Sequence, residues 1–319
     1  MTTAHEFAPG LESLRRRADE DQASAAGLRQ APEQLPHIRD LLRLRYGDGW
    51  SHPIPMAEPP SSGAQVVEGV VSGLLSHRSV RQYLPKALPA GTLELLVAAA
   101  QSAASSSNLQ LWSVIAVEDA ERRRALAQVA NNQAHIQQAP LFLVWIADLN
   151  RAAELARARG LSSEGLSYLE MFLMASIDTA LAAQNAVVAA EALGLGTVYI
   201  GALRNHPERV AEVLGVPSAA YAVFGLCVGW PNPDAPAAIK PRLPQRVVLH
   251  REKYRLSEPE HAAVAGYDRV MQAFYGEQGM PVPAGGWSLH SAKRVANAAA
   301  LNGRHVLRDV LERLGFALK

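Results

Sequence analysis

The longest apolar stretch of the chain, residues 170–193, most restricts how it can fold. It has the length of a long helix with apolar side chains on nearly all sides, and Gly194 and Gly196 end it. A helix with so little polar face must lie at the centre of a domain or at a subunit interface. Asp178 and Glu191 interrupt the stretch, which argues against a membrane span. We therefore expect a buried helix that supports dimerisation.

Helical and extended patterns alternate around this stretch. Residues 141–146 are continuously apolar, which indicates a strand covered on both faces. Further strands are expected at residues 112–117, 197–203 and 222–230, and helices from an N-cap at Thr92, at residues 120–129 and at residues 207–214. Residues 150–166 are polar, and we expect them to be mobile. The pattern predicts an α/β or α+β domain with a helix-covered sheet.

Composition excludes several classes of protein. With 319 residues, 49% of them hydrophobic and 19% charged, the chain can bury a full core. Its net charge of +1 predicts no general attraction to nucleic acid or to an anionic membrane. The single cysteine, Cys227, excludes an internal disulfide and a cysteine-cluster metal site, and we expect it to be a small buried apolar residue. The N-terminus lacks an export signal, so a cytoplasmic location is expected.

The N-terminal part differs from the rest. Residues 1–65 are rich in proline, serine, glutamine and charge, and residues 53–63 have the composition of a linker. We expect residues 1–65 to form a partly disordered extension. The folded domain is expected over residues 66–319, beginning with a helix at residues 66–75.

Two cationic segments lie far apart in the sequence. They are His77-Arg78-Ser79-Val80-Arg81 and Lys240-Pro241-Arg242. The residue before a proline favours an extended conformation, and side chains two apart on an extended chain share one face, roughly 6.5 Å apart. Such spacing suits a phosphate, which accepts several charge-assisted hydrogen bonds. Taken singly, each segment could be a solvated helix end or loop. Together they predict one anion site.

The remaining motifs favour a phosphate-bearing flavin as the ligand. The chain has no HExxH metal motif, no nucleophile elbow and no Walker loop. Gly194-Leu195-Gly196 precedes a strand, which is the wrong context for a dinucleotide fingerprint. A flavin carries the redox chemistry itself and asks few acids or bases of the protein. Arg81 is our candidate for the charge that stabilises the reduced ring at its pyrimidine end.

Five blocks resemble the nitroreductase family, and most of all its NADPH-dependent FMN oxidoreductase subgroup. They are residues 77–83, 104–112, 131–139, 194–205 and 239–244. The resemblance covers residues 66–319. It implies an α+β fold with a mixed β-sheet flanked by helices, and an intertwined homodimer with two FMN sites at the interface. It also implies ping-pong transfer of electrons from NADPH or NADH to a nitroaromatic, a quinone or free flavin.

The resemblance implies roles for individual residues. One family motif binds the FMN phosphate, the ribityl chain and the N1/O2 edge of the ring, and it is matched by His77, Arg78, Ser79 and Arg81. A second phosphate-binding motif is matched by Lys240 and Arg242. The residues that match a serine-rich turn donated by the second subunit are Ser105, Ser107 and Gln110. A ring contact is implied for Gln133, and a turn along the ring near N5 for Tyr199, Ile200, Gly201 and Ala202.

Other interpretations stay open. Tyr199 could be plain core, Gln133 a helix cap and His77 a helix C-cap. The family often has a second glycine where this chain has Ala202, and an arginine near residues 275–279 where this chain has Glu277 and Gln278. Arg304 matches a second basic position in the tail, so the choice between NADPH and NADH is undecided. The rival functions are a specialised flavoenzyme on the same scaffold, such as a reductive dehalogenase or a flavin-fragmenting enzyme, a non-catalytic flavin-binding protein, and an interaction protein that works through residues 1–65.

Overall fold

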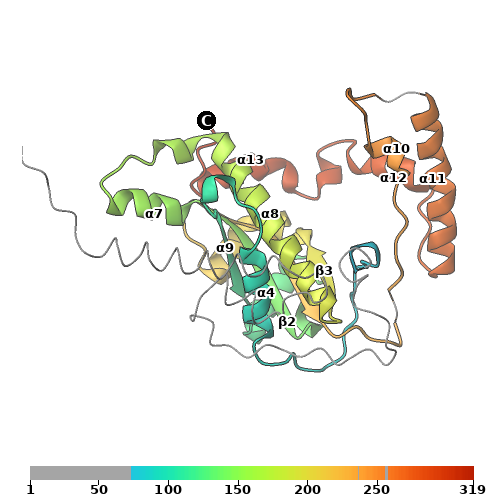
Figure 1. The fold of residues 1–319 in the computed structure, drawn as a ribbon, viewed down its shortest axis with the longest axis horizontal. Helices are drawn as coiled ribbons and strands as arrows, with labels where there is room; N and C mark the ends of the chain where they lie inside the picture. The colour runs from blue at the N-terminus through green and yellow to red at the C-terminus, as the bar shows by residue number, and fades with distance from the viewer. Residues whose placement is uncertain (1–72, 236, 256–257) are drawn as a thin grey trace, which may run out of the picture. The chain divides into compact units, whose positions relative to one another are not determined.

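A computed structural model describes residues 73–235, 237–255 and 258–319 (Figure 1). These residues belong to a compact unit that spans residues 53–319. The expected extension and linker, most of the helix expected at residues 66–75, and the domain boundary expected near residue 65 lie outside the described residues.

A four-stranded sheet forms the centre of this unit. Its strands are β1 (Trp112–Ala116), β2 (Leu141–Asp148), β3 (Gly196–Ile200) and β4 (Ala220–Gly229), in the order β1-β2-β4-β3. All three strand pairs are antiparallel. Ser79 adds an isolated parallel bridge to Thr197 on β3, outside the named strands, so the four-stranded sheet itself is antiparallel. The strand expected at residues 197–203 ends at Ile200, where a 3₁₀-helix begins.

The two faces of β2 build two cores, because successive side chains of a strand point to opposite faces. Leu141, Leu143 and Trp145 pack with α4 (Thr92–Gln101) and α8 (Leu169–Ala192). The alternate residues pack with helices on the other face, α5 (Ala120–Val129), α6 (His135–Gln138) and α9 (Pro207–Leu214). The strand covered on both faces is thereby confirmed, and Cys227 is a buried member of the second core, as expected.

Helix α8 is long and apolar enough to cross a membrane by length and composition. It nevertheless packs on the sheet, with residues such as Ala182, Ala186 and Ala190 fully buried against β2 and β4. Its opposite side carries exposed Leu173, Ile177 and Leu181. The expected central helix is confirmed, and an apolar stripe on it faces outward.

Two local expectations are wrong. Thr92 is the first residue of α4 and not its N-cap, because Gly91, at φ 83°, is the capping residue and the Thr92 hydroxyl donates to the Pro89 carbonyl at 2.7 Å. Residues 150–166, expected to be a mobile polar segment, contain helix α7 (Asn150–Ala158). Its charged side chains suit a helix with one exposed face, while Ala152 packs against the core that contains Leu149 and Tyr221.

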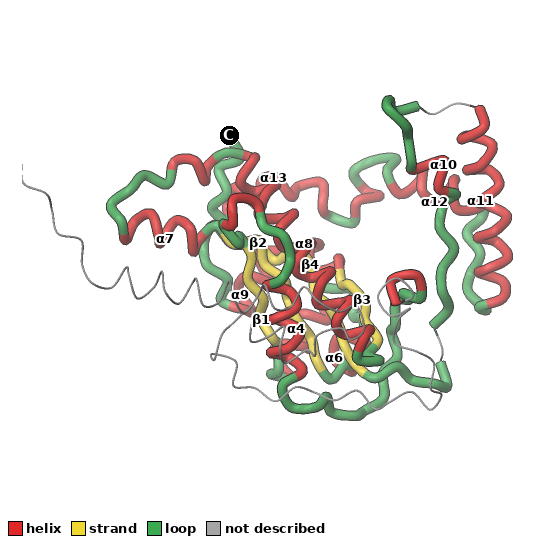
Figure 2. The backbone as a smooth tube through the Cα atoms, viewed as in Figure 1, coloured by secondary structure: helices red, strands yellow, loops and turns green. Residues whose placement is uncertain are grey.

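The C-terminal part is helical. Its helices are α10 (Gln245–Val248), α11 (Glu258–Glu277), α12 (Gly286–Arg294) and α13 (Leu307–Arg313). Helices α11 and α12 lie side by side (Figure 2), with the rings of Tyr267 and Trp287 5.0 Å apart. Helix α13 packs on the body of its own subunit, since Val310 and Leu311 are buried and Leu311 packs near Tyr221 of β4.

Short 3₁₀-helices connect these elements. They are η3 (Ser106–Asn108), η4 (Glu164–Ser167), η5 (Gly201–Asn205), η6 (Ala299–Leu301) and η7 (Arg304–Val306). The segments η3 and η5 contain residues that the sequence predicts to contact a flavin.

Candidate functional site

The two cationic segments meet at one cavity of about 360 Å³. Its lining includes every residue of the two motifs that was expected to bind phosphate, namely His77, Arg78, Ser79, Arg81, Lys240 and Arg242. The predicted meeting of the segments is confirmed. No aspartate or glutamate is among the described residues that line the cavity.

The first segment is held in place by the edge of the sheet. Ser79 bridges to Thr197, and the Val80 amide donates to the Thr197 carbonyl at 2.8 Å. Val80 is buried against β3 and comes so close to Gly196 that a Cβ there would lie 2.6 Å from Val80 Cγ2. Because Val80 points into the core, the alternation of an extended chain directs Ser79 and Arg81 to the cavity.

The second segment brings its charge close to the first. Partial burial lowers the pKa of Lys240, and the guanidinium groups of Arg81 and Arg242 lower it further. The Lys240 ammonium also lies 5.8 Å from the ring centre of Tyr275. Cations that depress one another in this way favour a bound anion, which would relieve their repulsion.

His77 has a protein partner at one ring nitrogen. Its Nδ1 lies 2.7 Å from Oε1 of Glu191 on α8, and the Thr197 hydroxyl donates to the same oxygen at 3.0 Å. The carboxylate thus joins the first segment, α8 and β3. With Nδ1 engaged, Nε2 is the ring nitrogen that remains for a ligand.

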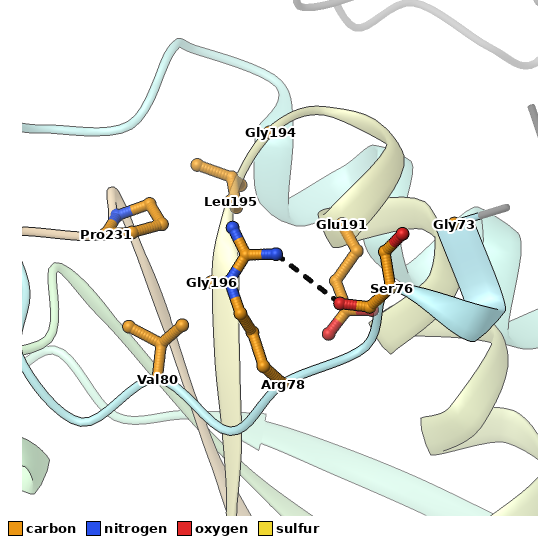
Figure 3. A pocket seen from close by; sticks show the side chains of 9 residues that line it. All are labelled: Gly73, Ser76, Arg78, Val80, Glu191, Gly194, Leu195, Gly196 and Pro231. Atoms are coloured by element: carbon orange, nitrogen blue, oxygen red, sulfur yellow. Dashed lines mark hydrogen bonds between the residues drawn. The ribbon is translucent and has the colours of Figure 1, made fainter. Parts of the chain in front are cut away.

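Arg78 borders a second, smaller cavity of about 130 Å³ (Figure 3). Figure 3 shows its guanidinium donating to the Ser76 carbonyl, at 3.4 Å, with Glu191 and the 194–196 loop alongside. Arg78 therefore borders both cavities.

The serine turn lies elsewhere. Ser105, Ser107 and Gln110 do not line the cation-rich cavity. Ser107 and Gln110 are exposed, whereas the Ser105 hydroxyl donates to the carboxylate of Asp178 at 2.7 Å. The assignment of these three residues to a flavin site stays a prediction.

The residues expected near the flavin ring have mixed surroundings. The Tyr199 hydroxyl donates to Gln184 Oε1 at 3.3 Å, and its ring packs edge-on against Phe224, with 4.9 Å between centroids. Ile200 is buried in the core, and Ala202 packs against that core. Gly201 begins η5, and a Cβ atom added to it would lie 3.3 Å from a guanidinium nitrogen of Arg204.

Gln133 precedes α6, and its backbone carbonyl accepts from the Ile136 amide at 3.1 Å. Neither Gln133 nor Tyr199 lines the cation-rich cavity, nor do residues 200–202. Their assignment to the flavin ring stays a prediction.

Sequence reasoning missed His135. It is only 9% exposed, its Nε2 has no hydrogen-bond partner, and burial followed by the charge of Arg81 lowers its pKa. A buried polar atom without a partner next to a site cation is a candidate ligand contact. The sequence signal was its place two residues after Gln133, in a block already chosen for the resemblance.

A group of arginines was also missed. Burial lowers the pKa of Arg304, and Arg204 and Arg294 lower it further, so both of these guanidinium groups lie near that of Arg304. Arg304 Nε donates to Asn205 Oδ1 at 2.9 Å, and the buried hydroxyl of Tyr221 has no partner. Only Arg304 matched a basic position of the family in the sequence. The other two arginines come close to it only in the folded chain, so no sequence pattern indicated them.

Comparison with known proteins gives consistent matches. The sequence model of the Nitroreductase family matches residues 74–230, and that of the Nitroreductase family, C-terminal domain, matches residues 240–319. The chain is 36% identical over 252 residues to FMN reductase (NADPH) of Bacillus subtilis (strain 168), which covers 78% of this chain and 99% of that protein. It is also 36% identical over 248 residues to the oxygen-insensitive NADPH nitroreductase of Salmonella typhimurium, covering 77% of this chain and 97% of the relative.

Among solved structures, the NADPH:FMN oxidoreductase from Vibrio harveyi complexed with NAD+ superposes with a TM-score of 0.70 at 33% identity. That match covers 79% of this chain and 100% of the other.

Proposed function

The chain belongs to the nitroreductase family, and we propose that it is an FMN-dependent NAD(P)H oxidoreductase. The observation that carries the proposal is the cavity where Arg81, Lys240 and Arg242 meet without an acidic neighbour among the described lining residues. The names of the relatives, FMN reductase and oxygen-insensitive NADPH nitroreductase, support the same activity.

The donor set of the cavity fits a phosphate ester. Arg81 and Arg242 offer planar forks, Lys240 a mobile point charge and Ser79 a hydroxyl, which together match the acceptor oxygens of a phosphate dianion. Bound FMN supplies the redox chemistry. The protein binds the phosphate, orients the ring and holds positive charge near it. In this proposal Arg81 is the cation at the pyrimidine edge, and His77 Nε2 and His135 Nε2 are further donors or acceptors.

We assign the nicotinamide nucleotide to the region of Arg204, Arg294 and Arg304. These arginines offer three positive charges, and no ion pair between them and an acidic side chain is seen among the described residues. Glu277 and Gln278 stand where the NADPH-dependent subgroup has an arginine, so we propose either NADPH or NADH as the electron donor. The proposed electron acceptors are nitroaromatics, quinones or free flavin, and each binds in the place that the nicotinamide has left.

The proposed active form is a homodimer. Exposed Leu173, Ile177 and Leu181 on α8 provide an apolar face that one subunit leaves uncovered, which is the behaviour of an interface helix. A dimer would also bring the serine turn of one subunit to the cavity of the other. The proposed location is the cytoplasm.

Purified protein with bound flavin, mixed anaerobically with NADPH or NADH in separate cuvettes, tests the activity. Rapid bleaching of the flavin absorbance is expected, followed by recovery when a quinone or a nitroaromatic is added. Bound flavin that neither nucleotide bleaches would favour a flavin-binding protein without this activity. Protein that takes up no FMN would refute the proposal.

A further inference from the structure

Asp178 is a buried carboxylate that the proposed function does not use. It is 2% exposed and lies on α8 between Ile177, which is 57% exposed, and the fully buried Thr179. A buried carboxylate needs several hydrogen bonds to offset its desolvation. Three such bonds reach it, and all come from the serine turn.

The partners of Asp178 are the two ends of that turn. At the start of the turn, the Ser105 hydroxyl donates to Oδ2 at 2.7 Å and the Ser106 amide to Oδ1 at 3.3 Å. At its end, the Leu111 amide donates to Oδ2 at 3.1 Å. The Ser105 hydroxyl accepts in turn from the Gln110 amide at 2.8 Å, which closes the loop. One carboxylate therefore holds both ends of the segment.

The turn needs this support because its backbone is strained. Ser107, Asn108 and Gln110 have φ values of 50°, 53° and 52°, a region that non-glycine residues rarely adopt. Residues 106–110 are exposed, so the body of their own subunit contributes little packing to hold them. Strained backbone persists where surrounding contacts over-determine it, and it concentrates at ligand-binding sites. Here the charge-assisted bonds to Asp178, together with the Arg151 guanidinium that donates to the Gln110 carbonyl, are those contacts.

We propose that Asp178 is a positioning residue that holds the serine turn in its flavin-contacting conformation and presents it to the cavity of the partner subunit. In this arrangement Ser105 does not touch the cofactor but links Asp178 to the Gln110 amide through its hydroxyl, whereas Ser107 and Gln110 contact the flavin. The inference rests on the proposed function. It also places the carboxylate that holds the turn beside the exposed apolar stripe, since Ile177 directly precedes Asp178 on α8.

The first test compares FMN affinity in two variants of the full-length protein. Asp178→Asn keeps the shape of the side chain but replaces one acceptor oxygen with an amide that cannot accept from a donor of the turn. A buried donor without a partner destabilises the flavin-contacting conformation of the turn, and this free-energy penalty should weaken FMN binding about tenfold or more. Ser105→Ala, which keeps the carboxylate, should shift the dissociation constant in the same direction and serves if Asp178→Asn does not fold.

Thr179→Val is the matched control. It removes a buried hydroxyl on the same helix that bonds the Ala175 and Ile146 carbonyls at 2.7 and 3.2 Å, and it leaves the turn untouched. Fluorescence titration with FMN, at a temperature where circular dichroism shows every variant folded, should give this control the wild-type dissociation constant. Unchanged affinity in both Asp178→Asn and Ser105→Ala would overturn the inference. Wild-type protein that binds no FMN would instead overturn the proposed function on which it rests.

The second test asks which subunit's site Asp178 serves. Differently tagged subunits are co-expressed, one with Asp178→Asn and the other with Lys240→Ala and Arg242→Ala. If Asp178 acts on the partner's cavity, both defects fall on one site and the heterodimer keeps one FMN of wild-type affinity. If it acts on its own cavity, each site carries one defect and no tightly bound FMN remains. The second result would overturn the presentation of the turn to the partner.

Discussion

The double substitution Lys240→Ala with Arg242→Ala tests the phosphate assignment most directly. Both side chains line the cavity with Arg81, and no acidic residue among the described lining residues compensates them. The pKa of Lys240 is already lowered by burial, Arg81 and Arg242, so these cations repel one another. Removing two cations should therefore leave the apoprotein at least as stable while weakening its hold on a phosphate.

The magnitude follows from the contacts that disappear. A hydrogen bond to a charged group contributes about 1.5–3 kcal/mol, so two of them contribute about 3–6 kcal/mol. Lys240, although partly buried, and Arg242 keep much of their surface in solvent, and solvent screening favours the lower end of this range. A loss of about 3 kcal/mol raises the dissociation constant of FMN roughly a hundredfold. The protein should then lose its yellow colour during purification.

Titration of apoprotein with FMN, followed by quenching of flavin fluorescence, measures the effect. The control is Arg246→Ala with Lys253→Ala, which removes the same charge from exposed positions that do not line the cavity. The affinity of the wild-type protein for FMN should fall when the salt concentration rises and when inorganic phosphate is added. The affinity of the double variant should depend much less on either. A double variant that purifies with a full complement of FMN would refute the assignment of the cavity to the phosphate.

Three further predictions concern the ring, the dimer and pH. Arg81→Ala should weaken FMN binding and slow flavin reduction by NAD(P)H, and a variant with bound flavin and normal turnover would contradict its role. Ile177→Lys, in the middle of the exposed stripe of α8, should yield a monomer in sedimentation velocity, whereas a persistent dimer would place the interface elsewhere. Burial, followed by the charge of Arg81, lowers the pKa of His135, so below about 6.5 the unfolded chain binds a proton that the folded protein resists. Stability should therefore decrease as the pH falls through this window, and His135→Asn should flatten that slope in urea unfolding at pH values between about 5 and about 7.

Much of the fold follows from local signals. The apolar run at residues 141–146 is a strand because each face of β2 meets its own core. Helix α9 has the expected ends, since Pro207 suits its first turn and Gly215 adopts the left-handed conformation, at φ 64°, that stops it. Such signals act within a few residues, so the sequence alone determines them. Their limit shows at Thr92, where the capping role moved to the neighbouring glycine.

The site divides in the same way. The sequence by itself predicted that the two cationic segments, with Arg81 in one and Lys240 in the other, form one anion site, because each carries a recognisable pattern of charge, and both segments line one cavity. Only the tertiary structure decided that Glu191 engages His77, that Asp178 holds the serine turn and that Arg204 approaches Arg304. These contacts join residues many positions apart, and a hydrogen bond or a repulsion across such a distance leaves no periodicity in the sequence. The first two contacts exist because α8 packs on the sheet and carries Asp178 and Glu191 at separate places along its length, a placement set by packing and not by local preference.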